Sequence, residues 1–217
     1  MFFSFYFIGS LYLIEKIGKI VITIGISIIL TLILIYTNLE EEPKRTSSLE
    51  PPRIKVEALY TNYKQYDDRW ANYPYSYTTI ETGGCGPAAI ANLAYIKNQS
   101  STPIDVADWL TANGYSTYKE GTERKGITSA LSYYGYSDIV HTYYSSDIIP
   151  KFDSDIREMG IFLVRGSANG ITWTATGHYI TIYDYTVGDD GLHYMLVSDS
   201  SDHDNDGWFC FETQISP

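Results

Sequence analysis

The run GGCGPAAIANLAYIK, residues 83–97, carries a strong helix signal. Pro87 lies near its start, small residues fill it, and apolar residues recur at helical spacing, so a buried helix is predicted over residues 86–97. Cys85 then lies at the amino terminus of this helix, where the amides and the helix dipole stabilise a thiolate nucleophile. The flanking glycines permit a tight turn. A purely structural cysteine is the competing interpretation.

Further helix signals follow this run. Thr102 as cap, Pro103 as first residue and Gly114 as stop predict a second helix. Residues 125–135, which end at a glycine, predict a third helix, and residues 147–159 are a candidate for a fourth.

The pattern changes after residue 160. The runs IFLVRG (161–166), GHYITIYDY (177–185) and LHYMLVSD (192–199) are rich in β-branched and aromatic residues and predict strands. The intervening TVGDDG (186–191) favours a tight turn, so the last two strands should form an antiparallel hairpin. The sequence therefore predicts an α+β fold in which N-terminal helices are followed by an antiparallel sheet.

The predicted hairpin brings a histidine towards a carboxylate. A turn centred on the aspartates at 189–190 makes the numbers of paired residues sum to about 379, which places Asp199 opposite Ile180 and within reach of His178. A one-residue slip would instead turn this carboxylate to the other face. Because a cysteine nucleophile uses a base oriented by a third group, Cys85, His178 and Asp199 are a candidate triad.

Three runs together resemble the peptidase C39-like family of papain-fold cysteine peptidases. They are QYDDRW (65–70), GCGPAA (84–89) and GHY (177–179), which occur in the family's order within residues 60–205. The resemblance implies a papain-like fold and hydrolysis of peptide bonds, and no cofactor is expected.

The resemblance also implies roles for individual residues. Gln65 would contribute to the oxyanion hole, Cys85 would be the nucleophile, His178 the base and Asp199 the group that orients it. The amide of Gln65 and the backbone N–H of Cys85 would then converge on a developing oxyanion. The family often has Asp-Pro where this chain has Asp199-Ser200.

The other histidines and the second cysteine are weaker candidates. His193 in a predicted strand and His141 in a tyrosine-rich run suit packing or surface roles, and His203 lies in an acidic loop. Cys85 and Cys210 complete no Cys/His zinc pattern and are interpreted as free thiols.

The acidic loop itself resembles part of a calcium site. Asp202, Asp204 and Asp206 match the start of the D-x-D-x-D-G pattern, whose alternating carboxylates bind Ca²⁺. The twelfth position is Thr213 instead of a glutamate, and no helix flanks the loop. A solvated acidic turn is therefore favoured over a calcium site, and no metal is expected.

An apolar run near the amino terminus predicts a membrane anchor. Residues 20–36 contain no charged side chain and reach the length of a spanning helix, and no cleavage pattern follows them. The predicted organisation is an anchor at 1–37, an extended stalk at 38–58 and a peptidase domain at 59–217. A buried helix of a soluble protein is the alternative interpretation of the apolar run.

Charge bears on orientation and on partners. Lys16 and Lys19 lie closest to the apolar run and favour a cytoplasmic amino terminus, a single-pass topology in the cell membrane and an extracellular domain. The charges of residues 1–59 cancel, so the net charge of −11 lies on residues 60–217. Such an acidic domain does not neutralise phosphates, which excludes nucleic acid as an expected partner.

The expected function is that of a surface-exposed, membrane-anchored cysteine peptidase acting on a peptide or protein. A peptidoglycan amidase or endopeptidase is an alternative on the same fold. A catalytically inactive module that binds peptides or glycans is a second alternative, and a purely structural membrane protein is a third.

Overall fold

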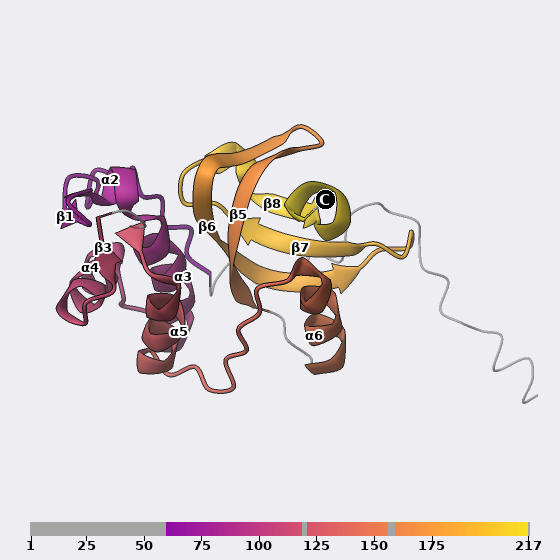
Figure 1. Ribbon diagram of the computed structural model, residues 1–217, viewed down its shortest axis with the longest axis horizontal. Helices are drawn as coiled ribbons and strands as arrows, with labels where there is room; N and C mark the ends of the chain where they lie inside the picture. Colours follow the sequence, from indigo (N-terminus) through magenta and orange to yellow (C-terminus); the bar gives the residue numbers. More distant parts are fainter. Residues whose placement is uncertain (1–59, 119–120, 156–158, 217) are drawn as a thin grey trace, which may run out of the picture. The chain divides into compact units, whose positions relative to one another are not determined.

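The computed structural model of the protein describes residues 60–118, 121–155 and 159–216, and Figure 1 shows the elements that they form. The predicted anchor at 1–37 and the predicted stalk at 38–58 lie outside the described residues. Across the described ranges, no helix is long and apolar enough to cross a membrane.

The four predicted helices are present. They are α3 (Cys85–Asn98), α4 (Pro103–Ala112), α5 (Arg124–Tyr133) and α6 (Ile148–Asp155). At the start of α4, the Thr102 side chain accepts a hydrogen bond from the Asp105 N–H, and the Asp105 carboxylate accepts one from the Thr102 N–H. This capping box satisfies two backbone donors that a helix terminus leaves unpaired. After α4, Gly114 has a φ of 76°, which glycine adopts without strain.

A short helix and two short hairpins lie next to the start of α3 in the fold, and none of them was predicted. They are α2 (Ile80–Gly83), β1 (Pro74–Tyr75) with β2 (Thr78–Thr79), and β3 (Ser116–Thr117) with β4 (Gly121–Thr122). Ser76 of the first hairpin donates a hydrogen bond to the carbonyl of Thr117 in the second. Strands of two residues are too short to show an alternating pattern, so the sequence did not predict them.

The C-terminal half forms a four-stranded antiparallel sheet in the order β5, β6, β7, β8 (Figure 1). The strands are β5 (Gly160–Ala168), β6 (Ile171–Val187), β7 (His193–Ser198) and β8 (Gly207–Cys210). Three short helical turns accompany the sheet and α6, namely η1 (Ser145–Asp147), η2 (His203–Asn205) and η3 (Phe211–Ile215). The predicted α+β class and three predicted strands are confirmed, whereas β8 was missed.

The register of the β6–β7 hairpin differs from the prediction near its turn. There Val187 pairs with His193, which is one residue out of the predicted pairing. A β-bulge between residues 182 and 184 takes up the extra residue, so that Thr181 pairs with Ser198 in the predicted register. The bulge therefore restores the alignment at the end of the hairpin that carries the candidate carboxylate.

Both faces of the sheet are buried. On one face α3 packs against β6, where Ile90 and Tyr183 belong to one apolar cluster. On the other face Ile182 belongs to a second cluster with Phe152 of α6 and Phe211 of η3. Neighbouring residues of β6 enter opposite clusters because side chains alternate along a pleated strand.

One buried polar side chain joins α3 to the sheet. Asn92 is 0% exposed, and its Oδ1 accepts hydrogen bonds from the Tyr63 N–H at 2.9 Å and from Thr61 Oγ1 at 3.2 Å. Its Nδ2 donates to Thr181 Oγ1 and Ser198 Oγ, each at 3.3 Å. The amide therefore ties the segment before the helix, the helix and two strands together.

Replacing this amide should destabilise the fold. We expect Asn92→Ala to lower the free energy of unfolding by about 2 to 4 kcal/mol, because it leaves several buried polar groups without a partner. Urea unfolding of the full chain measures the change. Asn72→Ala, at an exposed position, is the control and should stay within about 0.5 kcal/mol of the parent. Equal effects of the two substitutions would contradict the role of Asn92.

Candidate active site

Cys85 is the first residue of α3, and its side chain is partly exposed. The chain passes from α2 into α3 at Gly84, where a β-carbon would lie 2.3 Å from the carbonyl oxygen of Ile80. A β-carbon on Gly86 would lie 2.2 Å from Thr122 Oγ1. Close packing therefore requires glycine on both sides of Cys85. The thiol lies at the start of the helix, where the backbone N–H groups have no partner within the helix.

His178 lies in β6 and is 5% exposed. Its Nε2 is 2.6 Å from Asp199 Oδ1, so the structure brings together the histidine and the carboxylate that the hairpin register predicted. Because Nε2 is engaged by this hydrogen bond, Nδ1 is the ring nitrogen left for the thiol of Cys85.

The protonation of His178 reflects both neighbours. Burial lowers the pKa of His178, but hydrogen bonds and charge interactions with Asp199 and Cys85 raise it to about 9. The imidazole therefore holds its proton at neutral pH between a carboxylate and a thiol. A thiol, a base and a group that orients the base make up the arrangement used in covalent catalysis by cysteine.

Asp199 is 0% exposed and is held by several donors. Its Oδ1 also accepts from the Ser201 N–H at 2.8 Å and from Ser201 Oγ at 2.9 Å, and its Oδ2 accepts from Asn205 Nδ2 at 3.0 Å. Burial raises the pKa of Asp199, but the hydrogen bond and charge of His178, with the donors Asn205 and Ser201, lower it to about 2. The carboxylate is thus an anion fixed in one orientation.

Gln65 is buried and is hydrogen-bonded to the segments that carry Asp199 and Cys85. Its backbone N–H donates to the Ser200 carbonyl at 2.8 Å, and its Oε1 accepts from Ser200 Oγ at 3.2 Å. Its Nε2 donates to the carbonyl of Glu81, four residues before Cys85. The side chain therefore bridges the segment after Asp199 and the turn before the thiol, and one Nε2 hydrogen remains for a further acceptor.

Two carboxylates of the acidic loop have hydrogen-bond or ion-pair partners within the chain. Asp202 accepts a hydrogen bond from the Asp204 N–H at 2.9 Å, which caps the turn η2. Asp206 forms an ion pair with Lys64 at 2.7 Å. In the part of the chain that the structure describes, no three His, Cys, Asp or Glu side chains are grouped to hold a metal ion.

Asp206 instead braces the backbone around the candidate carboxylate. Its Oδ1 accepts from the Asp199 N–H at 2.9 Å, and its Oδ2 accepts from Asn62 Nδ2 at 2.7 Å. Its partner Lys64 also donates to the carbonyl of Asp199. The loop that resembles a calcium site in sequence thus fixes the position of Asp199.

The remaining histidines and the second cysteine lie elsewhere. His193 Nδ1 bonds to Glu212, the ring of His141 is 4.5 Å from the ring of Tyr143, and His203 is exposed. Cys210 is buried and donates to Glu212 at 3.4 Å. Both cysteines are free, as predicted.

Sequence reasoning missed two groups that support the site. Asn205 donates hydrogen bonds to Asp199 and to the Thr172 carbonyl. It lies inside the acidic motif, which was interpreted only as a possible calcium loop, so a role for its amide was not considered. The buried pair of Tyr75 and Thr122, 2.6 Å apart, lies in short hairpins that carry no pattern. The position of Asn205 shortly after the predicted strand 192–199 was the available signal.

A search of protein-family models, curated proteins and solved structures finds no match to this chain.

The protonation of His178 is measurable by NMR. In the full chain its imidazole should remain protonated at pH 8, where an ordinary histidine is neutral, and should titrate near pH 9. Asp199→Asn should move this titration to lower pH, because the largest interaction that raises the pKa of His178 is removed. Asp202→Asn changes an exposed carboxylate three residues further along the chain and should leave the titration of His178 unchanged. An unshifted titration in Asp199→Asn would contradict the assignment.

Proposed function

We propose that this chain is a membrane-anchored, surface-exposed cysteine peptidase that hydrolyses peptide bonds of a peptide or protein substrate. The observation that carries the proposal is the buried hydrogen bond of 2.6 Å between His178 and Asp199. Interactions with Asp199 and Cys85 also raise the pKa of His178 to about 9, so the imidazole is expected to be protonated at neutral pH. An imidazolium beside a thiol favours the thiolate, which is the reactive form of a cysteine nucleophile.

Each residue of the site then has a chemical task. The Cys85 thiolate attacks the carbonyl carbon, and the oxyanion that forms accepts hydrogen bonds from the Cys85 N–H and from Gln65 Nε2. His178 gives its proton to the leaving amine as the C–N bond breaks, which leaves an acyl group on the sulfur. Water then attacks this thioester, with His178 as base, and the acid product leaves Cys85 as the thiolate beside a protonated imidazole.

The motif resemblance supports the same assignment. The runs that resemble the peptidase C39-like family lie far apart in the sequence, yet Gln65, Cys85 and His178 belong to one hydrogen-bonded region. Asp199 is hydrogen-bonded to His178, as an orienting group would be, although Ser200 follows it where the family often has proline. The order of helices followed by an antiparallel sheet is consistent with a papain-like fold.

The location rests on the apolar run at residues 20–36, which has the length of a spanning helix. Lys16 and Lys19 before it favour a cytoplasmic amino terminus, so the peptidase domain would face outwards.

Selective labelling tests the nucleophile. At pH 6, iodoacetamide should modify Cys85 of the full chain about tenfold or more faster than a free model thiol, because little of an ordinary thiol is ionised at that pH. Cys85→Ala should lose both labelling and hydrolysis, whereas Cys210→Ala should keep both. Labelling of Cys85 no faster than the model thiol, together with unchanged hydrolysis by Cys85→Ala, would sink the proposal.

The substrate class is tested by incubating the full chain with a peptide library and with purified cell wall. Turnover of peptides that requires Cys85 supports the peptidase. Turnover of cell wall alone would identify the peptidoglycan amidase or endopeptidase. Saturable binding without turnover of either, unchanged in Cys85→Ala, would identify a binding module.

Gln65→Met separates the oxyanion role from a structural one. Methionine has a similar length but no amide donor, so kcat should fall about 10²- to 10³-fold while KM changes little. Alkylation of Cys85 needs no oxyanion hole and should stay within about threefold of the parent rate. A loss of labelling as large as the loss of turnover would show that Gln65 only holds the site together.

A further inference from the structure

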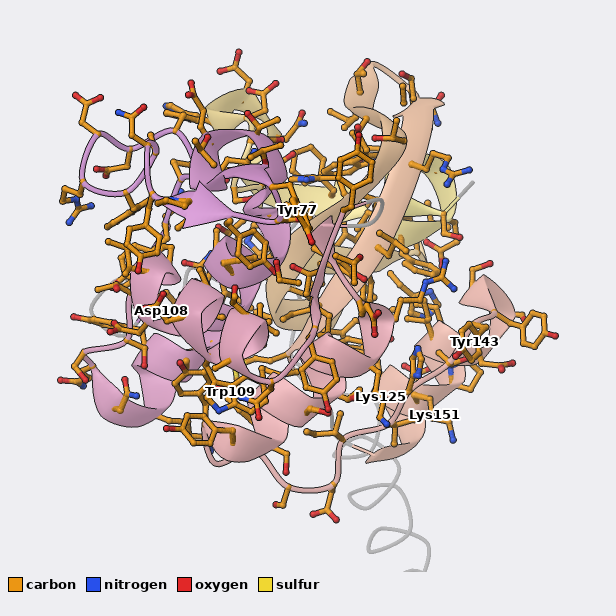
Figure 2. All side chains as sticks on the ribbon, turned by 60° about the vertical axis from the view of Figure 1, so that its left-hand side comes forward. Tyr77, Asp108, Trp109, Lys125, Tyr143 and Lys151 are labelled. Atoms are coloured by element: carbon orange, nitrogen blue, oxygen red, sulfur yellow. The ribbon has the colours of Figure 1, made fainter. Side chains whose placement is uncertain are left out.

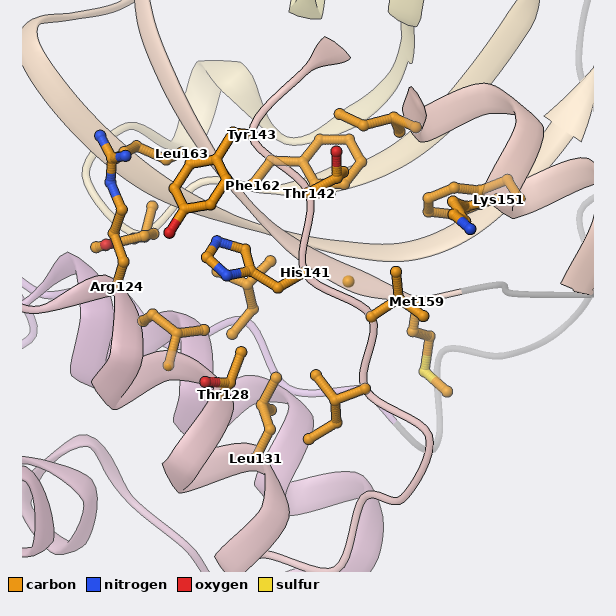
Figure 3. A pocket seen from close by; sticks show the side chains of 18 of the residues that line it. Arg124, Thr128, Leu131, His141, Thr142, Tyr143, Lys151, Met159, Phe162 and Leu163 are labelled. Carbon is orange, nitrogen blue, oxygen red and sulfur yellow. The ribbon is translucent and has the colours of Figure 1, made fainter. Parts of the chain in front are cut away.

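A second concave site lies apart from the candidate active site. It is a cavity of about 460 Å³ lined by α5, the segment 136–145, α6 and β5 (Figure 3). Cys85, His178, Asp199 and Gln65 are not among its lining residues. This volume falls within the range of pockets that bind small ligands.

The interior of the cavity is largely apolar. Figure 3 shows the His141 ring inside it, with Thr128 and Leu131 of α5 on one side and Phe162 of β5 on the other. Met159 adds a further apolar wall. Such walls offer dispersion contacts and few hydrogen-bond partners, so they suit a hydrocarbon body.

Exposed apolar side chains mark the opening. Tyr143 is 71% exposed, and Val140 and Leu163 are each 44% exposed, and all three line the cavity. Large hydrophobic side chains that gather around one hollow are typical of a ligand or interaction site. The opening is therefore accessible to an apolar molecule from solution or from a membrane.

The charges around the cavity are opposite to those of the domain. Arg124, Lys151 and His141 line it, and among its described lining residues Asp138 is the acidic one. In the described ranges neither Arg124 nor Lys151 forms an ion pair, and the guanidinium of Arg124 lies 5.8 Å from the ring centre of Tyr143. Figure 3 shows the two cations at opposite ends of the cavity, Arg124 beside Tyr143 and Lys151 on α6. Arg124, which has no carboxylate partner in the described part of the chain, is complementary to an anionic head group.

We propose that this cavity binds a fatty-acid carboxylate, with its hydrocarbon chain between α5 and β5 and its carboxylate at Arg124, whose planar guanidinium can donate two parallel hydrogen bonds to it. A peptide of the same charge would bring a row of backbone N–H and C=O groups that need partners, which apolar walls do not provide. The site is independent of the proposed peptidase chemistry. The cavity nevertheless adjoins strand β6, because Val164 of β5 lines the cavity and pairs with His178 of β6.

Decanoate is the probe. The full chain, reconstituted in nanodiscs of zwitterionic lipid, is titrated with decanoate carrying ¹³C at its carboxyl group, and binding is followed by NMR. Nanodiscs without protein account for partition into lipid. We expect one saturable site and binding of decanol at least about tenfold weaker, because decanol lacks the charge that Arg124 recognises.

Variants locate the site. Arg124→Gln should weaken decanoate binding about tenfold or more. Lys125→Gln is the matched control, since this neighbour of Arg124 does not line the cavity, and it should bind within about twofold of the parent. Lys125, Lys151 and Tyr143 are marked in Figure 2.

Thr128→Trp should fill the cavity and abolish binding of both decanoate and decanol, while the melting temperature shows that the fold persists.

Several results would overturn the proposal. They are equal affinity for decanoate and decanol, equal effects of Arg124→Gln and Lys125→Gln, and full binding by a folded Thr128→Trp. Tighter binding of acetyl-Leu-Phe, a peptide carboxylate, than of decanoate would assign the cavity to peptides instead.

Discussion

The hydrogen bond between His178 Nε2 and Asp199 Oδ1 links β6 to the residue that directly follows β7. Both side chains are buried, and a buried carboxylate is costly unless it is paired and hydrogen-bonded. The pair therefore constrains the register of β6 and β7, because a one-residue slip would turn Asp199 to the other face and leave both groups without a partner. The bulge between residues 182 and 184 is the local irregularity that satisfies this constraint.

Several polar side chains around the site form hydrogen bonds that hold Asp199 in place. Asn205 binds the second oxygen of Asp199, and Asp206 with Lys64 holds its backbone on both the N–H and the C=O side. An aspartate in this position is restrained at side chain and main chain together, so it keeps the imidazole in one orientation. The acidic loop is thus a structural brace made from the residue types that a calcium loop uses.

Charge is divided unevenly over the domain. Lys64 and Arg69 are neutralised by Asp206 and Asp67 close to the candidate active site. Arg124 and Lys151, in contrast, line an apolar cavity in which Asp138 is the acidic residue among those described. The net charge of −11 conceals this local excess of cations, because a sum over the chain carries no information on position.

Local patterns predicted α3, α4, α5 and the β6–β7 hairpin, because caps, periodicity and turn residues act between neighbours in the sequence. The same hairpin logic placed Asp199 near His178, and the glycines around Cys85 indicated a tight turn before a helix. Strand β8 was missed because its four residues follow directly on the acidic loop without a clear alternation.

Only the tertiary structure decided which distant segments meet. It brings Gln65 between Glu81 and Ser200, the thiol of Cys85 to His178, and α5 opposite β5 around a cationic cavity. These contacts depend on how whole helices and sheets bury their apolar faces, and no short-range propensity encodes that packing. The sequence by itself therefore determined the elements and the residues capable of chemistry, whereas packing decided which of them act together.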